Sequence, residues 1–111
     1  MPSKSRNKGN SYERKIAQEF RDLGYTDCKT SRYESKMLDD MKVDLTNTKP
    51  YNVQLKAVEK LGILHNVLAE MPDDDNINVV FHKVSRKGEV VAMYKEDFYE
   101  LIKQLNNGTV K

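Results

Sequence analysis

The chain has very few of the residues that build disulfides and zinc sites. Its 111 residues include one cysteine, Cys28, and two histidines, His65 and His82. A lone cysteine excludes an internal disulfide and a cysteine-rich zinc site, and two histidines distant in sequence argue against a zinc enzyme. We therefore expect both histidines to occupy structural or surface positions.

Long apolar runs are also missing. Charged residues make up 32% of the chain, and no stretch approaches the about 18 apolar residues of a membrane-spanning helix. The first ten residues are basic and lack the apolar segment of a signal peptide. These features predict a soluble, cytoplasmic protein, and the length of 111 residues predicts one domain with its own core.

The charge that is present is distributed unevenly along the chain. The net charge is only +2. Before position 61 the basic residues are Lys4, Arg6, Lys8, Arg14, Lys15, Arg21, Lys29, Arg32, Lys36, Lys42, Lys49, Lys56 and Lys60. Residues 73–75 are all aspartate and form an acidic segment later in the chain. The basic half has the character of a phosphate-binding surface. The alternative is that these side chains only keep a small domain in solution.

A helix is predicted over residues 11–23. Ser11 is a suitable N-cap, and Gly24 is a suitable end. The apolar stripe of this helix consists of Tyr12, Ile16, Phe20 and Leu23. Glu13 falls on the flank of that stripe and not on the solvent side, so its carboxylate requires a partner.

The rest of the chain alternates between strand and helix patterns. The expected elements are a flexible basic arm at residues 1–9, a strand at 26–30, an exposed loop at 31–41, a hairpin at 42–57, a helix at 61–71, a strand at 77–81, a strand at 90–94, and a helix opened by Glu96 or Asp97 and ended by residues 106–108. The order α-β-β-β-α-β-β-α predicts an α/β domain at residues 10–111, with a central mixed sheet flanked by helices.

The hairpin at residues 42–57 carries polar side chains on one face. Residues 43–45 and 53–56 alternate apolar and polar positions on either side of a turn-like stretch at 48–50. One face of the hairpin is then wholly apolar. If Asn47 pairs with Tyr51, Asp44 lies opposite Gln54.

This register has two chemical consequences. Side chains directly opposite each other are roughly 5 Å apart, so the Asp44 carboxylate and the Gln54 amide oxygen could share a metal ion. The same register sets Lys42 opposite Lys56, which is unfavourable unless an anion lies between them. A phosphate group would supply that anion.

Three motifs in this order resemble the PD-(D/E)xK nuclease superfamily, and within it the small Holliday-junction resolvases of phage and archaeal type. They are Lys-Gly at 8–9 with Tyr-Glu-Arg at 12–14, Lys-Val-Asp-Leu at 42–45, and Val-Gln-Leu-Lys at 53–56. The resemblance covers nearly the whole chain. It implies a restriction-endonuclease-like fold, a magnesium-dependent endonuclease, DNA as the partner, a homodimer, and the host cytoplasm if the protein is phage-encoded.

The resemblance also assigns roles to single residues. Glu13 matches the acid of the first helix, Asp44 the central aspartate, Gln54 the acidic position of the (D/E)xK element, and Lys56 its lysine. The implied ligands of Mg²⁺, or of Mn²⁺ as a substitute, are Glu13, Asp44, Gln54 and the carbonyl of Leu55. Lys56 would orient or help deprotonate the attacking water and stabilise developing negative charge. The residues expected to contact DNA are Arg6, Lys8, Ser31, Arg32, Ser35, Lys36 and Lys42.

The sequence departs from the family pattern at two positions. Lys42-Val43 stands where the family has a proline before the aspartate, a residue that performs no chemistry. Gln54 replaces an acid and removes one negative charge from the metal site, although an amide oxygen is still a hard oxygen donor.

Each motif also has a plainer interpretation. An aspartate beside a strand is a common turn residue, and a Gln-x-Lys strand face is often simply exposed. Glu13 alone could be a charge favoured by the helix macrodipole, and Asp39 with Asp40 is more simply a loop than a metal support. Two alternatives to a junction-cleaving nuclease therefore remain: a nuclease for linear duplex DNA, and a nucleic-acid-binding protein with weak catalysis.

Overall fold

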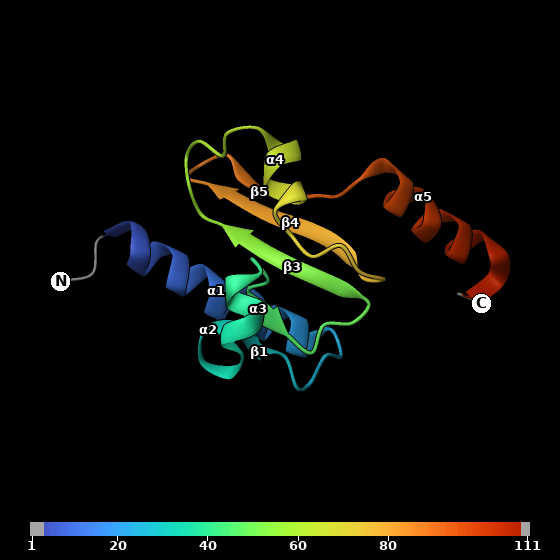
Figure 1. Cartoon of the computed structure of the whole chain (residues 1–111), viewed down its shortest axis with the longest axis horizontal. Helices are drawn as coiled ribbons and strands as arrows, with labels where there is room; N and C mark the ends of the chain where they lie inside the picture. The colour runs from blue at the N-terminus through green and yellow to red at the C-terminus, as the bar shows by residue number, and fades with distance from the viewer. Residues whose placement is uncertain (1–3, 110–111) are drawn as a thin grey trace.

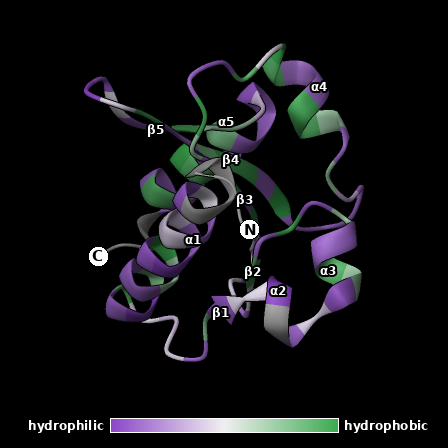
Figure 2. Cartoon of the chain, turned by 90° about the vertical axis from the view of Figure 1, so that its left-hand side faces the viewer, coloured by the Kyte–Doolittle hydropathy of each residue, from purple (hydrophilic) through white to green (hydrophobic). Residues whose placement is uncertain are grey.

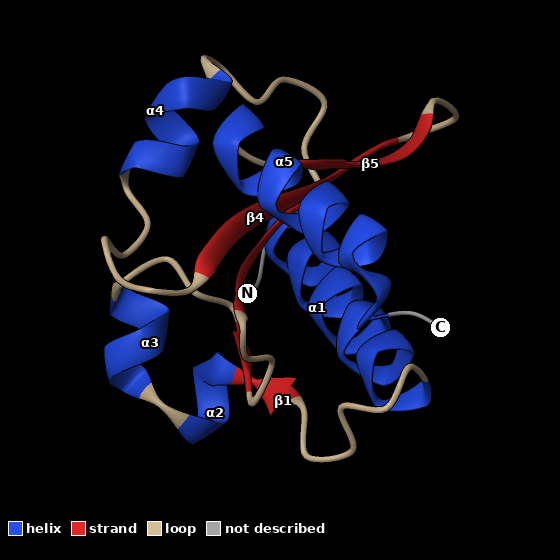
Figure 3. Ribbon diagram, turned by 90° about the vertical axis from the view of Figure 1, so that its right-hand side faces the viewer, coloured by secondary structure: helices blue, strands red, loops and turns tan. Residues whose placement is uncertain are grey.

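The computed structural model describes residues 4–109 and the side chains of residues 8–32 and 34–107. The elements are α1 (Lys4–Asp22), β1 (Lys29–Thr30), α2 (Ser31–Glu34), α3 (Lys36–Asp40), β2 (Leu45–Thr46), β3 (Tyr51–Lys56), α4 (Leu64–Ala69), β4 (Ile77–Val84), β5 (Gly88–Ala92), α5 (Lys95–Gln104) and a π-helical turn, η1 (Leu105–Thr109). They form one α/β domain with a mixed sheet and helices on both of its faces (Figures 1 and 3). None of the described helices is long and apolar enough to cross a membrane.

The main sheet has the order β3-β4-β5. β3 and β4 run parallel, joined by a crossover that contains α4, and β4 and β5 form an antiparallel hairpin. Val79 and Val80 are buried on opposite faces of β4, which is the pattern of a central strand. Two shorter strands, β1 and β2, pair antiparallel in a separate small sheet.

The hydrophobic core lies mainly between the sheet and α1. Its buried members are Tyr12, Ile16, Ala17, Phe20, Cys28, Leu45, Val53, Leu55, Ala57 and Val79. A smaller cluster of Leu68, Met71 and Val80 lies on the opposite face, under α4. Figure 2 shows α1 on one side of the strands and α4 on the other, with hydrophilic and hydrophobic positions alternating around α1. The apolar stripe of the first helix is thereby confirmed at Tyr12, Ile16 and Phe20, whereas Leu23 is exposed.

The first helix starts earlier than the sequence indicated. α1 begins at Lys4, so residues 4–9 are helical where a flexible arm was expected. Lys8 reaches across to the β4–β5 turn, where its Nζ lies 3.4 Å from Ser85 Oγ, and it is 3.6 Å from Glu59. These tertiary contacts support the first turns despite Gly9, whose helix propensity is low.

The end of α1 agrees with the prediction. Gly24 has φ 116°, in the left-handed region that glycine adopts without a steric penalty. The amide of Tyr25 donates to the carbonyl of Phe20 at 3.0 Å, which closes the helix end.

The expected loop at residues 31–41 is instead two short helices, α2 and α3. The side chain of Ser35 accepts a hydrogen bond from the amide of Leu38, so it caps α3. The prediction was wrong here because a polar segment with few apolar residues has no clear helical periodicity. Capping by Ser35 is nevertheless enough to stabilise a single helical turn.

The last helix, α5, was predicted, but its end and its surroundings differ. The chain continues past Gln104 into η1, which extends to Thr109, so residues 106–108 do not end the helical conformation. No residue of α5 is buried. Phe98, Ile102 and Leu105 are exposed, and Figure 1 shows α5 standing away from the sheet.

Candidate active site

Asp44 is fixed from both sides by backbone hydrogen bonds. Its amide donates to the carbonyl of Val53 at 2.8 Å, and its own carbonyl accepts from the amide of Ser31 at 2.8 Å. The side-chain oxygen Oδ2 accepts from the amide of Leu55 at 2.8 Å. Asp44 therefore ties the segment before β2 to the middle of β3 and holds its carboxylate beside that strand.

The carboxyl group of Asp44 has an unusual environment. Burial raises its pKa from 3.8 to about 6, against the lowering effect of the Leu55 hydrogen bond. The carboxylates of Glu13 and Asp39 raise the pKa further, and Lys56 lowers it. Two acids and a lysine therefore lie close enough to Asp44 to act on its charge, and a perturbed acid of this kind is typical of a functional site.

Gln54 lies between the two residues of β3 that Asp44 contacts. Only 2% of Gln54 is exposed, and its Oε1 is buried without a hydrogen-bond partner. A buried amide oxygen without a partner is costly and uncommon in native proteins. An unpaired amide oxygen on the strand segment that holds a half-buried carboxylate is a hard oxygen donor of the kind that cations such as Mg²⁺ bind.

Glu13 lies on the flank of the buried stripe of α1, as predicted, and only 9% of it is exposed. Its Oε2 is 3.0 Å from Arg32 Nη2, so the buried carboxylate does have a partner. Arg32 was expected to contact DNA, but in the structure it pairs with an acid of the candidate site. One oxygen of Glu13 is thereby held in place.

Lys56 and Leu55 complete the group contributed by β3. Lys56 is half-buried at the end of the strand and acts on the Asp44 carboxylate from there. Leu55 donates its amide to Asp44 and buries its side chain in the core on the α1 side. Among the described side chains no three of His, Cys, Asp or Glu converge as a metal cluster.

The predicted hairpin register is not present. β2 consists of Leu45–Thr46 and pairs with β1, whereas β3 pairs with β4. Lys42 lies in a turn with φ 66° and is not opposite Lys56. The predicted ladder does not form because the Leu55 amide donates to the Asp44 side chain where a paired strand would offer a carbonyl, although the Asp44 amide does donate to the Val53 carbonyl. The expectation of a wholly apolar face is correct for Val53 and Leu55.

The residues expected to contact DNA are spread over several environments. Ser31 is fully buried and its hydroxyl donates to the carbonyl of Val43 at 2.6 Å, so it does not present its side chain to DNA. Ser35 is engaged as the α3 cap. Lys36 is exposed, 3.5 Å from Asp40, and Lys42 is exposed. The side chain of Arg6 lies outside the described residues.

A network of asparagines was not foreseen. Asn52 donates from Nδ2 to Asn78 Oδ1 at 2.8 Å and to Asp74 Oδ1 at 3.0 Å, and its Oδ1 accepts from Asn76 at 3.3 Å. Asn52 and Asn78 are direct partners in the parallel register of β3 and β4. The sequence signal was an asparagine at the second position of each of two strands, but only the parallel register joins them.

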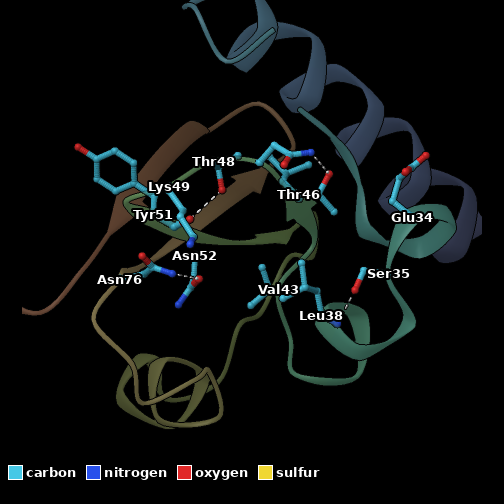
Figure 4. Close-up of a pocket in the computed structure, with 12 residues that line it drawn as sticks. Glu34, Ser35, Leu38, Val43, Thr46, Thr48, Lys49, Tyr51, Asn52 and Asn76 are labelled. Atoms are coloured by element: carbon cyan, nitrogen blue, oxygen red, sulfur yellow. Dashed lines mark hydrogen bonds between the residues drawn. The ribbon is translucent and has the colours of Figure 1, made fainter. Parts of the chain in front are cut away.

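The network borders a cavity of about 580 Å³, shown in Figure 4. The cavity lies between the α2–α3 segment and the turn before β3, and its polar lining includes Glu34, Ser35, Asn47, Lys49, Asn52 and Asn76. Asp44 and Gln54 are not among its lining residues. The candidate site is therefore defined by its charges and its unpaired oxygen, and not by a cavity.

Comparison with family models, with curated protein sequences and with solved structures gave no match.

Proposed function

We propose that the protein is a metal-dependent endonuclease that hydrolyses phosphodiester bonds in DNA, most specifically in branched DNA, in the cytoplasm. The observation that carries this proposal is the buried Oε1 of Gln54, which has no hydrogen-bond partner and belongs to the strand segment that binds Asp44. The Asp44 carboxyl, with a pKa of about 6, supplies the charged half of a cation site.

These residues fit a hard divalent cation. Asp44 and Glu13 would provide carboxylate oxygens, and Gln54 and the Leu55 carbonyl would provide neutral oxygens, which is the donor chemistry preferred by Mg²⁺ and tolerated by Mn²⁺. When bound, such an ion makes a water molecule nucleophilic and stabilises negative charge on the phosphate. An ion would also reverse the electrostatic cost that now raises the pKa of Asp44.

The protein supplies the remaining functions. Lys56 lies within electrostatic range of Asp44, so it would orient the attacking water and stabilise negative charge that develops on the phosphate. Arg32 holds Glu13 through the 3.0 Å ion pair and is a positioning residue in this scheme. Lys36 and Lys42 are exposed and would bind flanking backbone phosphates.

A homodimer is part of the proposal. One site cuts one strand, whereas resolution of a junction needs two symmetric cuts. α5 supports association because it is a ten-residue helix with no buried residue, and a helix of that length is marginal unless its apolar face is covered.

A second candidate function is a nucleic-acid-binding protein with weak catalysis. It is favoured by Gln54 itself, which supplies no charge, and by Glu13, which is already paired with Arg32. The third possibility, a nuclease for linear duplex, shares the whole site and lacks only the dimer.

One experiment separates the three. The protein is incubated with a labelled four-way junction and with a linear duplex of matched sequence, in Mg²⁺ or in EDTA, with Asp44→Asn as the control. Symmetric cuts in the junction support the main proposal, and cuts in both substrates at equal rates support the duplex nuclease. Binding without any Mg²⁺-dependent cut supports the binding protein.

A further inference from the structure

A second cluster of basic and hydroxyl groups lies beside the candidate site. It lines a cavity of about 150 Å³ whose walls are Lys8, Ser11, Tyr12, Lys15, Ala57 and Lys83. The cavity adjoins the candidate site along the chain, because Tyr12 precedes Glu13 in α1 and Ala57 follows Lys56 at the end of β3. α1 passes the β4–β5 hairpin here (Figure 3).

The lining is made almost entirely of hydrogen-bond donors. Lysine ammonium groups donate and cannot accept, and a hydroxyl can donate to any acceptor that enters. The hydroxyl of Tyr12 is the unusual member, because Tyr12 is 3% exposed and its buried Oη makes no hydrogen bond of good geometry. The Glu89 carboxylate lies close enough to raise the pKa of this hydroxyl, after the larger effect of burial. Without a well-formed bond to Glu89, the buried donor can still take an acceptor that enters the cavity.

The lysines retain capacity for a ligand. Lys15 Nζ is 3.0 Å from Glu89 and 4.0 Å from Glu19, and Lys8 Nζ is 3.6 Å from Glu59 and 3.4 Å from Ser85 Oγ. Each ammonium has three protons, so two partners leave one proton for a ligand. Lys83 lies 5.8 Å from the centre of the Tyr12 ring, and its charge helps Lys15, the larger cause, to lower the pKa of Glu89.

We propose that this cavity binds a phosphate group of the nucleic-acid backbone next to the phosphodiester at the candidate site. The inference rests on the proposed action on DNA, but it does not require cleavage. A phosphate offers several acceptor oxygens and a negative charge, which match three ammonium groups and a hydroxyl that makes no hydrogen bond of good geometry. Glu89 occupies one side of Lys15 in the absence of DNA and would compete with that phosphate.

The test measures DNA binding in EDTA, by fluorescence anisotropy of a labelled duplex over a series of salt concentrations. Lys83→Gln should weaken binding by about tenfold at low salt and reduce the slope of log affinity against log salt by about 0.9, the value for one lost phosphate contact. The matched control is Lys87→Gln, which removes the same charge from the exposed turn of the same hairpin. Equal effects of the two substitutions would overturn the proposal.

Tyr12→Phe separates a binding site from a patch of surface charge. It removes the buried hydroxyl and no charge, so affinity should fall about threefold while the salt slope stays constant. Its melting temperature without DNA should change little, because no protein hydrogen bond of good geometry is lost. Unchanged affinity in a folded Tyr12→Phe protein would contradict the proposal.

Glu89→Gln should act in the opposite direction and raise affinity, because it frees Lys15. Inorganic phosphate, added at constant ionic strength and followed by amide chemical shifts at Tyr12 and Lys83, distinguishes the source of the ligand. If inorganic phosphate shifts these amides but Lys83→Gln binds DNA as tightly as the wild type, the cavity binds free phosphate and does not contact the DNA backbone. A protein that passes the binding tests but does not cut DNA would refute only the nuclease function.

Discussion

Asn52 and Gln54 are two buried amides on the same face of β3, two positions apart, and they differ in how many hydrogen bonds their side chains form. Asn52 is 5% exposed and hydrogen-bonds to three side chains. Gln54 is 2% exposed and its Oε1 bonds to nothing in the described part of the chain. Equal burial with unequal pairing separates an amide that stabilises the fold from one whose oxygen contributes no hydrogen bond to it.

The positions of the two residues along the strand explain the difference. Asn52 lies near the start of β3, where Asn78 of β4 and the acidic loop supply partners. Gln54 lies opposite Val80, which is fully buried and apolar, so the neighbouring strand offers it no hydrogen bond. The carboxylate of Asp44 is also near that end of the strand, and two acceptor oxygens cannot satisfy each other without a proton or a cation.

The largest effect on DNA cleavage is expected when the negative charge of Asp44 is removed, because Gln54 can be a metal ligand only beside that charge. Asp44→Asn keeps an oxygen that can accept from Leu55 but removes the negative charge. If the site holds a metal, cleavage should fall by about a thousandfold or more, while DNA affinity in EDTA stays within about twofold. A junction-cleavage time course and an anisotropy titration measure the two quantities. Full cleavage by Asp44→Asn would reject the metal site.

Next in size is a direct comparison of the two amides. Asn52→Leu removes three side-chain hydrogen bonds and leaves Asn78 Oδ1 and Asn76 Nδ2 without the partner that Asn52 supplied. It should lower the free energy of unfolding by ~3 kcal/mol. Gln54→Met replaces glutamine by a side chain of nearly the same volume and removes an oxygen that is already unpaired. In EDTA it should therefore change the free energy of unfolding by less than ~1 kcal/mol. Urea denaturation of both variants checks this. Equal losses would show that Gln54 has a structural partner.

The sequence was sufficient where side chains act through local periodicity. The stripe of α1, the end at Gly24 and the apolar side of β3 follow from spacings of three to four and of two residues. The position of Glu13 beside buried residues followed from the same argument. These features depend on residues close together in the chain.

Apart from the short helices at residues 31–41, which depend on local capping, the failures involve partners that are distant in sequence. Ser31 was predicted to contact DNA, but its hydroxyl donates to the carbonyl of Val43 and it is buried. The register around Asp44 changed because its carboxylate, and not a strand carbonyl, accepts from the Leu55 amide. The Asn52 network requires parallel pairing of β3 with β4, which only the α4 crossover establishes.

A smaller effect follows from the Asp44 pKa of about 6. In the unfolded chain this group titrates near 3.8, so between these pH values the folded protein retains a proton that the unfolded protein has lost. Stability should therefore decrease as pH rises from about 4 through 6. In EDTA, Asp44→Asn should match the wild type at pH 4 and exceed its free energy of unfolding by ~2 kcal/mol at pH 7.5.

Thermal denaturation over this pH range measures the difference, and Mg²⁺ provides a second comparison. At pH 7.5 Mg²⁺ should raise the melting temperature of the wild type and leave that of Asp44→Asn unchanged, since ligand binding to the folded state stabilises it. A constant difference between the two proteins from pH 4 to 7.5 would mean that Asp44 is not protonated in the folded state near pH 5.

The smallest effect is expected when Gln54 regains the charge that the resemblance assigns to its position. Gln54→Glu adds a carboxylate to the oxygen donors, so the Mg²⁺ concentration at half-maximal activity should fall by about three- to tenfold. The rate at saturating Mg²⁺ should change little, because a more negative set of ligands also weakens the ion as an electrophile and raises the pKa of its bound water. Gln18→Glu is the matched control, because it makes the same chemical change on the exposed side of α1 and should leave the Mg²⁺ titration unchanged. The Asn52 hydrogen bonds are intact in both variants, so the free energy of unfolding in EDTA shows whether each variant is still folded. An unaltered Mg²⁺ midpoint in a folded Gln54→Glu protein would show that the unpaired oxygen is not a metal ligand, and would favour the binding protein over the nuclease.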